Sequence, residues 1–416
     1  MDTIIIRGGT PLRGRVPISG SKNAALPILI ATLLSEEPSL IGNLPDIQDV
    51  RLTLRILENM GAVVERVDSA TYRIDPRHVA PSPSPDPLTG RLRASAYLLG
   101  AGVGRFGVGR IGQVGGCDFG GRPIDQHIKA LAALGAGVLM TEDEICATAD
   151  GLHGADICFD LVSVGATVNA VLAAVRAEGE SVLHNAACEP HVADLCRYLI
   201  RCGADIRGGG TGTIRIRGVR RLHGATYGVI PDMIEAGTYL LAGAATCGAV
   251  TVTGVLPTHL RALLSALGDM GADLDVGEHT VTLFAPHRLR GADIVTQPYP
   301  GFPTDLQPPF TAAVAAMEGE CRIQENIWRH RFRYVEELRK MGADIRLCED
   351  STAYVTGTPL LGADVQIPDL RAGAALMIAA CAADGHSTLH GAAYVERGYE
   401  DILGKWQALG AEIRAV

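Results

Sequence analysis

The sequence predicts an α/β protein made of six copies of one α/β unit, with three copies in each of two domains. The chain has 416 residues, which is too long for one ordinary hydrophobic core. In one setting, directly after a helical pattern, the dipeptide Gly-Ala recurs six times at intervals of roughly 70 residues, longer than the repeats of solenoid proteins. Each copy ends a helical pattern, and most copies start an alternating strand pattern. The copies begin at Gly61, Gly135, Gly203, Gly271, Gly342 and Gly410.

The fourth copy illustrates the pattern. Leu260, Leu263 and Leu267 mark one face of a helix. Gly271 then fits the C′ position, where a left-handed backbone conformation ends a helix. Alternation around Val281 predicts a strand after the next turn.

The N-terminal segment suggests how the domains divide. Residues 1–7 predict a strand that precedes the first full unit, and we expect it to pair with the C-terminal half. One domain would then contain residues 1–21 and 231–416, and the other residues 22–230. The chain would cross between the domains near Lys22 and again near Ile230 and Pro231.

Composition excludes several classes of function. The net charge of −9 and the lack of a basic stripe argue against a nucleic-acid partner. Ten cysteines without C-x-x-C pairs or metal-ligand spacing are typical of reduced thiols in the cytoplasm. No apolar run is long enough to span a bilayer, and no signal-peptide pattern is present. No motif calls for a metal or an organic cofactor, and the sequence does not indicate an oligomeric state.

A glycine-rich stretch at residues 115–127 carries a candidate reactive thiol. Two glycine pairs bracket Cys117, and Arg122 and Pro123 lead into a helical pattern. Pro123 fits the first position of a helix, whose N-terminus favours an anion. A thiol beside an arginine and a helix N-terminus is expected to be reactive. The alternative is a surface hairpin with an incidental cysteine.

Isolated cations occur in turn-like settings along the chain. Lys22 at a helix start is unusual unless an anion neutralises it. Each cation alone fits a solvated charge or a surface ion pair. Together they can hold a small polyanion through bidentate contacts. The arginines concerned are Arg93, Arg122, Arg331, Arg371 and Arg397.

Two further turns have two interpretations each. Asp305 lies in a turn kinked by Pro303, where it can cap the next helix or act as a general base toward a hydroxyl. The small residues 163–167 form either a simple tight turn or a cradle of N–H groups for phosphate.

Five segments, in their order along the chain, closely resemble motifs of the enolpyruvyl transferase family. The resemblance is to the branch of UDP-N-acetylglucosamine enolpyruvyl transferases, also called 1-carboxyvinyltransferases. The five segments are residues 21–27 (SKNAALP), 115–117 (GGC) with 121–125 (GRPID), 163–167 (SVGAT), 302–305 (FPTD) and 397–400 (RGYE). The resemblance implies an inside-out α/β barrel in each domain, with helices inside and two crossovers. It implies transfer of the enolpyruvyl group of phosphoenolpyruvate to the 3′-hydroxyl of the nucleotide sugar, an early step of cell-wall peptidoglycan synthesis.

The resemblance also implies roles for single residues. Cys117 would protonate the donor and be alkylated by an epoxide phosphonate such as fosfomycin, and Asp305 would accept the proton of the attacking hydroxyl. Lys22, Arg122 and Arg397 would hold the phosphate, and Arg331 and Arg371 the carboxylate, with Asn23 and Asp369 nearby. The nucleotide side would be lined by Arg93, Arg122, Pro123, Ile124, Asp125, Gln126, Leu161, Val162, Ser163, Val164, Gly165, Thr304, Asp305 and Ile327.

Departures from the family pattern leave the acceptor open. Leu161 stands where some members have a lysine, and Met233 where arginine is common. Pro308 and His191 also differ from the usual residues. The alternatives are the same chemistry on another hydroxyl, such as that of UMP in nucleoside-antibiotic biosynthesis, and a catalytically silent nucleotide-sugar sensor. The shikimate-pathway relative fits less well, because the cysteine loop belongs to the nucleotide-sugar branch.

Overall fold

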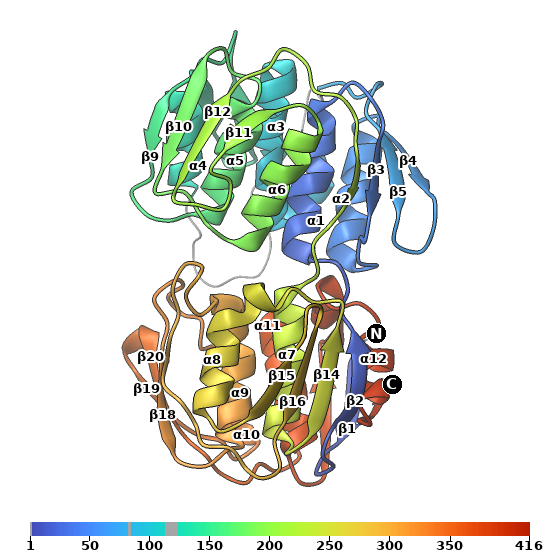
Figure 1. Ribbon diagram of the computed structural model, residues 1–416, viewed down its shortest axis with the longest axis vertical. Coiled ribbons are helices and arrows are strands. Elements are labelled where there is room, and N and C mark those ends of the chain that lie inside the picture. Colours follow the sequence, from blue (N-terminus) through green and yellow to red (C-terminus); the bar gives the residue numbers. More distant parts are fainter. Residues whose placement is uncertain (1, 82–84, 113–123) are drawn as a thin grey trace. The chain divides into compact units, whose positions relative to one another are not determined.

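The computed structural model describes residues 2–81, 85–112 and 124–416, and they form two compact units (Figure 1). The first unit contains residues 2–19 and 231–416. The second contains residues 20–230 apart from the gaps. Within the described residues, each unit contains three sheets and three predominantly buried helices.

The described strands of the first unit form three four-stranded sheets that mix parallel and antiparallel pairs. In sheet order, the first contains β21 (Asp364–Gln366), β22 (His386–His390), β1 (Thr3–Arg7) and β23 (Glu412–Ala415). The second contains β15 (Asp273–Val276), β16 (Thr280–Phe284), β14 (Ala249–Thr253) and β2 (Arg13–Pro17). The third contains β17 (Ile294–Val295), β18 (Glu320–Gln324), β20 (Thr352–Thr356) and β19 (Asp344–Cys348).

The N-terminal strand joins the C-terminal half, as expected. β1 lies between β22 and β23 and is antiparallel to both, with Ile5 opposite Thr388 on one side and Arg414 on the other. Ile4 and Ile6 are fully buried because alternate residues of the strand face the core. This pairing confirms the prediction for residues 1–7.

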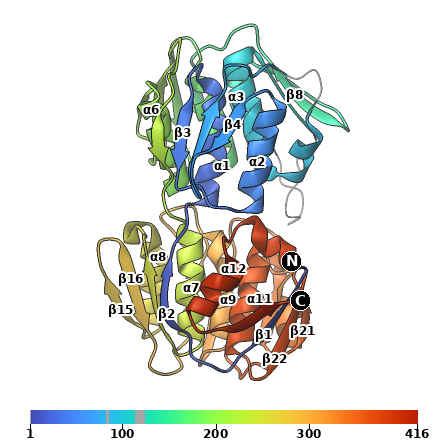
Figure 2. The same cartoon turned by 90° about the vertical axis from the view of Figure 1, so that its right-hand side faces the viewer.

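Helices fill the inside of the first unit (Figure 2). Three nearly fully buried helices pack against one another: α7 (Met233–Ala245), α9 (Gln307–Ala315) and α11 (Leu370–Ala382). Helices with one buried face are α8 (Arg261–Asp269), α10 (Val335–Lys340) and α12 (Ile402–Ala408). Short 3-10 helices are η4 (Pro257–Leu260), η5 (Thr304–Leu306), η6 (Glu349–Ser351) and η7 (Ala392–Arg397).

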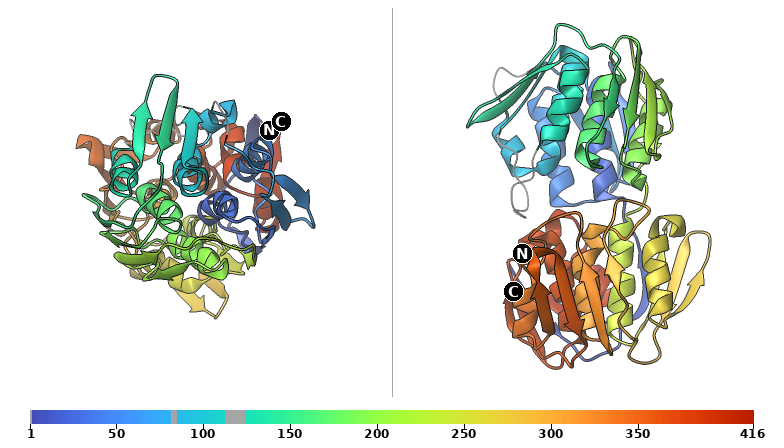
Figure 3. Two further views of the ribbon diagram at one scale, coloured as in Figure 1. Left: turned by 90° about the horizontal axis from the view of Figure 1, so that it is seen from above. Right: turned by 90° about the vertical axis from the view of Figure 1, so that its left-hand side faces the viewer.

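The second unit repeats this plan (Figure 3). One sheet contains β13 (Thr226–Gly228), β3 (Ser39–Gly42), β5 (Tyr72–Asp75) and β4 (Val63–Arg66), and another contains β11 (Asp205–Arg207), β12 (Thr213–Arg217), β10 (Glu180–His184) and β9 (Asp156–Cys158). Within the described residues, the remaining sheet contains β6 (Val108–Gly112), β8 (Glu144–Thr148) and β7 (Gly137–Met140).

The helices of the second unit divide in the same way. The predominantly buried ones are α1 (Lys22–Ala31), α3 (Tyr97–Phe106) and α5 (Val164–Ala174). The others are α2 (Gln48–Asn59), α4 (Asp125–Ala133) and α6 (Pro190–Arg201), with 3-10 helices η1 (Thr32–Leu34), η2 (Pro87–Arg91) and η3 (Arg93–Ala96). Helices that are apolar on all sides belong inside a core, so each unit is an inside-out α/β barrel, as expected.

The six Gly-Ala dipeptides predicted to end helices, from Gly61 to Gly410, all do so in the same way. The glycine has a φ of 86–102° and donates its N–H to the carbonyl three residues earlier. The alanine donates to the carbonyl five residues before it, which completes a Schellman motif. A strand follows each motif: β4, β7, β11, β15, β19 and β23. The prediction of six α/β units is therefore confirmed.

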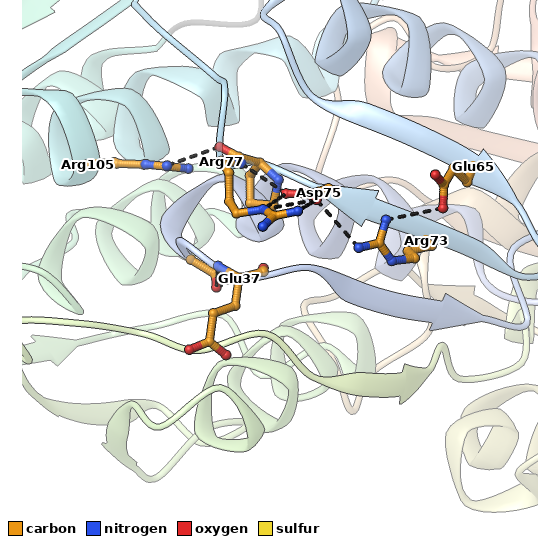
Figure 4. A network of polar contacts seen from close by, with 8 residues as sticks. Glu37, Glu65, Arg73, Asp75, Arg77 and Arg105 are labelled. Carbon is orange, nitrogen blue, oxygen red and sulfur yellow. Dashed lines mark hydrogen bonds and ion pairs between the residues drawn. The ribbon is translucent and has the colours of Figure 1, made fainter.

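A polar network closes the end of β5 in the second unit (Figure 4). Nη2 of Arg77 donates to Oδ2 of Asp75 at 2.6 Å, and Arg73 contacts the same oxygen at 3.5 Å. Hydrogen bonding from Arg77 outweighs the effect of burial and lowers the pKa of Asp75 to about 2. Nearby, Nη2 of Arg105 donates to the carbonyl of Pro76 at 3.1 Å.

Two further features concern the described residues only. None of the helices resolved there combines the length and apolar composition that crossing a bilayer requires. The nine cysteines in those ranges are all free thiols.

Candidate active site

Asp305 lies opposite two buried arginines in the first unit. Its side chain is 29% exposed, whereas those of Arg331 and Arg371 are 1% and 5% exposed. Nη2 of Arg331 donates to Oδ1 of Asp305 at 3.0 Å, and Nη2 of Arg371 donates to Oδ2 at 3.0 Å. Asp305 does not cap α9, because Leu306 is the N-cap and makes no side-chain cap. Two guanidinium groups turned toward one carboxylate also suit the carboxylate of a small ligand.

Arg371 is held in place from several sides. Oδ1 of Asp369 caps α11 by accepting the backbone N–H of Arg371 at 2.9 Å. The guanidinium carbon lies 5.5 Å from the centre of the Tyr399 ring, whose hydroxyl is 2.9 Å from Oγ1 of Thr238. Burial lowers the pKa of Arg371, but the neighbouring Asp305 carboxylate and Tyr399 raise it above its ordinary value. Arg371 is therefore a fixed cation.

Glu325 organises the turn that carries Asp305, and the sequence did not single it out. Its buried carboxylate follows β18 and accepts Oγ1–H of Thr304 at 2.9 Å. It also accepts the backbone N–H groups of Ile327 at 2.8 Å and Trp328 at 3.0 Å. One buried side chain thus links two residues of the expected nucleotide side, Thr304 and Ile327. Its only sequence signal is an acidic residue directly after a strand.

Lys22 is the first residue of α1 in the second unit, as the sequence suggested. Its Nζ lies 2.7 Å from Oδ2 of Asp49, a nearly buried carboxylate in the first turn of α2. This partner offsets the unfavourable interaction of a lysine with a helix N-terminus. Asn23 follows and is partly exposed. The sequence did not predict Asp49, because its distance along the chain hides the contact.

The expected nucleotide residues 161–165 lie at the start of α5. Oγ of Ser163 caps the helix by accepting the N–H of Ala166 at 3.3 Å. The first N–H groups of a helix lack acceptors within it, so those of Val164 and Gly165 are available to an anion. Leu161 is 55% exposed beside this turn, and Val162 is partly buried.

Contacts from α4 fix the segment before this turn. The amide of Gln126 donates to Oδ2 of Asp160 at 3.0 Å, and its oxygen accepts the backbone N–H of Asp160 at the same distance. Lys129 holds the other carboxylate oxygen at 2.6 Å. The amide of Gln126 also donates to the exposed Asp125 at 2.9 Å. Asp160 was another residue that the sequence did not indicate.

The remaining predicted residues occupy other elements or lie outside the described ranges. Arg93 begins η3 and is half-buried, and burial lowers its pKa. Arg397 ends η7 and is partly exposed, and Ile124 is the buried N-cap of α4. Cys117, Arg122 and Pro123 fall outside the described residues.

Two departures from the expected pattern have simple structural settings. Met233 begins α7 after the N-cap Asp232 and lines a small pocket with His259, Tyr299 and Leu306. Pro308 lies in the first turn of α9, where a missing N–H is tolerated.

The chain belongs to a family of carboxyvinyl transferases. The model of the EPSP synthase (3-phosphoshikimate 1-carboxyvinyltransferase) family matches residues 6–406. The protein is therefore an enzyme of the enolpyruvyl (carboxyvinyl) transferase class, as the sequence motifs implied.

Named relatives match it over the full length. It is 46% identical over 416 residues to UDP-N-acetylglucosamine 1-carboxyvinyltransferase 2 of Clostridium acetobutylicum, covering 100% of this chain and 99% of the relative. It is 47% identical over 414 residues to UDP-N-acetylglucosamine 1-carboxyvinyltransferase 3 of Caldanaerobacter subterraneus subsp. tengcongensis, covering 99% of each.

Solved structures share the fold. The crystal structure of the enolpyruvyl transferase NikO from Streptomyces tendae is 28% identical, with a TM-score of 0.89 over 99% of this chain and 98% of that one. EPSP synthase from Acinetobacter baumannii, at 20% identity, has a TM-score of 0.74 over 100% of both chains. The expected fold class is thereby confirmed.

Proposed function

We propose that this enzyme transfers the enolpyruvyl group of phosphoenolpyruvate to the 3′-hydroxyl of UDP-N-acetylglucosamine and releases phosphate. The full-length relatives at 46% and 47% identity, both named for that nucleotide sugar, support this acceptor. The observation that carries the proposal is the pair of hydrogen bonds from Arg331 and Arg371 to Asp305. These contacts place a candidate general base beside two guanidinium groups that can bind the carboxylate of the donor.

The reaction has an addition and an elimination. In the addition, Asp305 accepts the hydroxyl proton, the 3′-oxygen bonds to C2 of the donor, and Cys117 delivers a proton to C3. The intermediate is a tetrahedral ketal. In the elimination, the Cys117 thiolate takes a proton back from C3, the bond between C2 and the phosphate oxygen breaks, and the leaving phosphate takes up the proton held by Asp305. Acid, base and positioned cations each stabilise charge that develops in these steps.

Asp305 has two tasks in this scheme. In the absence of donor its carboxylate occupies both guanidinium groups, each at 3.0 Å. The donor carboxylate has the same charge and shape, so it competes with Asp305 for Arg331 and Arg371. Donor binding then leaves Asp305 less tightly held and able to accept a proton. Binding of the donor therefore releases the carboxylate of Asp305 from the arginines and allows it to act as a base.

The other roles follow the family motifs. Lys22, Arg122 and Arg397 bind the phosphate, with Asn23 and Asp369 nearby, and fosfomycin alkylates Cys117. The nucleotide side uses Arg93, Arg122 to Gln126, Leu161 to Gly165, Thr304, Asp305 and Ile327. We also propose that the two compact units are the folding domains and that the enzyme works in the cytoplasm in peptidoglycan synthesis.

A second candidate is the same chemistry on a hydroxyl of UMP. The exposed Leu161 favours it, because an apolar side chain at this turn offers no charge to a diphosphate. The TM-score of 0.89 with the enolpyruvyl transferase NikO is compatible with either acceptor.

Phosphate release from phosphoenolpyruvate distinguishes the candidates. Wild type and Cys117→Ala are compared with UDP-N-acetylglucosamine, UMP or shikimate 3-phosphate as acceptor. Release with the nucleotide sugar, lost in the variant, is the expected result. Release with UMP alone would assign the second candidate. If none of the three acceptors supports phosphate release, only the sensor hypothesis would remain.

A further inference from the structure

We infer that His127 binds a phosphate group of the acceptor nucleotide, donating a hydrogen bond from Nε2–H at the first turn of α5. This inference rests on the proposed function and adds a residue to its nucleotide side. His127 is on α4, next to Gln126, and is only 4% exposed.

The tautomer of His127 follows from its neighbour Asn169. Oδ1 of Asn169 accepts the backbone N–H of Gly100 at 2.8 Å, which fixes the orientation of the amide. The amide nitrogen therefore donates to the carbonyl of Ala96 at 2.9 Å and to Nδ1 of His127 at 2.7 Å. Because Nδ1 accepts, the ring proton is on Nε2. Burial, and then the charge of Arg93, lower the pKa of His127 to about 4, so the ring is neutral at pH 7.

Nε2 lies against the N-terminal turn of α5. A Cβ added to Gly165 would lie 2.6 Å from this nitrogen, so only glycine leaves room for the ring. Asn169 is the hydrogen-bond partner of His127 within the described residues, and it contacts Nδ1 alone. No described residue accepts the proton of Nε2, so this N–H is available to an acceptor that a ligand supplies.

The surroundings select an anion as the acceptor of this hydrogen bond. The first N–H groups of α5 favour negative charge at the same turn. The positive charge of Arg93 acts on the same ring. Asp125 is the one acidic group that acts on His127 among the described residues, and its effect is smaller than that of Arg93. A phosphate oxygen accepts from backbone N–H, guanidinium and neutral imidazole alike.

Two variants separate binding from packing. In His127→Gln the side-chain amide can replace the donor at Nε2, whereas in His127→Asn it can replace the contact of Nδ1 with Asn169 but cannot reach the turn. A hydrogen bond to a charged group contributes about 1.5–3 kcal/mol. We therefore expect His127→Asn to weaken UDP binding by roughly 10- to 100-fold, and His127→Gln to retain most of it. A packing role predicts the reverse order.

Isothermal titration with UDP and with uridine measures these affinities, and thermal melting reports whether the variants fold. Uridine binding should be equal in the wild type and both variants, because uridine lacks the phosphates. Equal UDP affinities, the reverse order, or no UDP binding by the wild type would overturn the inference.

NMR of the wild-type imidazole provides a test that needs no folded variant. UDP should slow exchange of the Nε2 proton and raise the pKa of His127, and an unchanged titration would contradict the inference. Failure of the proposed function is separable from failure of this inference. A protein that binds UDP through His127 but does not consume phosphoenolpyruvate would refute only the function.

Discussion

Replacing Asp305 with asparagine should impair turnover and, at the same time, strengthen binding of phosphoenolpyruvate. The two effects arise from the same contacts. Asp305 serves as the base, and its carboxylate also competes with the donor for Arg331 and Arg371. An amide of the same shape cannot accept the hydroxyl proton, and it competes for the guanidinium groups without a negative charge.

The magnitude follows from two hydrogen bonds of 3.0 Å. Each charge-assisted bond contributes about 1.5–3 kcal/mol when buried, and the 29% exposure of Asp305 favours the lower end. Replacing both charged contacts by neutral ones removes about 1–2 kcal/mol of competition, or about 5- to 30-fold in donor affinity. Loss of a general base lowers kcat by roughly 10²- to 10⁴-fold.

Donor affinity is measured by calorimetric titration of phosphoenolpyruvate, and turnover by phosphate release. Asp273→Asn is a matched control, because Asp273 is an exposed aspartate of the same unit on β15. It should change neither quantity. A donor Kd that is unchanged or weaker in Asp305→Asn would refute the competition, even if turnover falls.

Three stability predictions follow from other contacts. Asp75→Asn should lower the free energy of unfolding by about 1–2 kcal/mol at pH 7, because stability from a carboxyl with a lowered pKa is present above pH 4 and is lost toward pH 2. Urea unfolding at pH 7 and acid titration test this, and an equal loss at pH 2 would contradict it. Gly271→Ala should cost about 1 kcal/mol through its φ of 92° alone, and Gly61→Ala more, because the new Cβ would also lie 2.6 Å from a carbonyl oxygen. Equal urea midpoints for the two would refute this difference. Lys405→Met should cost about 3–5 kcal/mol, because it leaves Glu235, 2.6 Å away and buried, without its cation. Adding Glu235→Gln should restore part of the loss in thermal melts, and no recovery would argue against an ionic origin.

Much of the fold could be predicted because its signals are local. A glycine at C′ and the helix before it lie within a few residues of one another, so the six Gly-Ala dipeptides that follow a helical pattern marked helix ends, which the structure confirms at φ values of 86–102°. The strand at residues 1–7 could be recognised from its own residues, although its partners β22 and β23 are at the other end of the chain.

The contacts of the candidate site were less predictable because they join distant segments. Sequence motifs identified Asp305, Arg331 and Arg371 as candidates. They did not indicate that Asp305 forms hydrogen bonds with both arginines. Glu325 carried no motif of its own, and His127 was only the last residue of the glycine-rich stretch. Their importance appears only when folding brings the Thr304 turn to β18, and α4 to the start of α5 (Asp125 and Gly165 being forty residues apart in sequence).

The most direct test of the account is the structure of the reaction product. Wild-type enzyme is incubated with phosphoenolpyruvate and UDP-N-acetylglucosamine, and the product is analysed by mass spectrometry and proton NMR. The account predicts a carboxyvinyl ether on the 3′-oxygen of the sugar, with one phosphate released per product molecule by the stoichiometry of the reaction. An unmodified nucleotide sugar, together with a carboxyvinyl ether formed only on UMP or shikimate 3-phosphate, would contradict it.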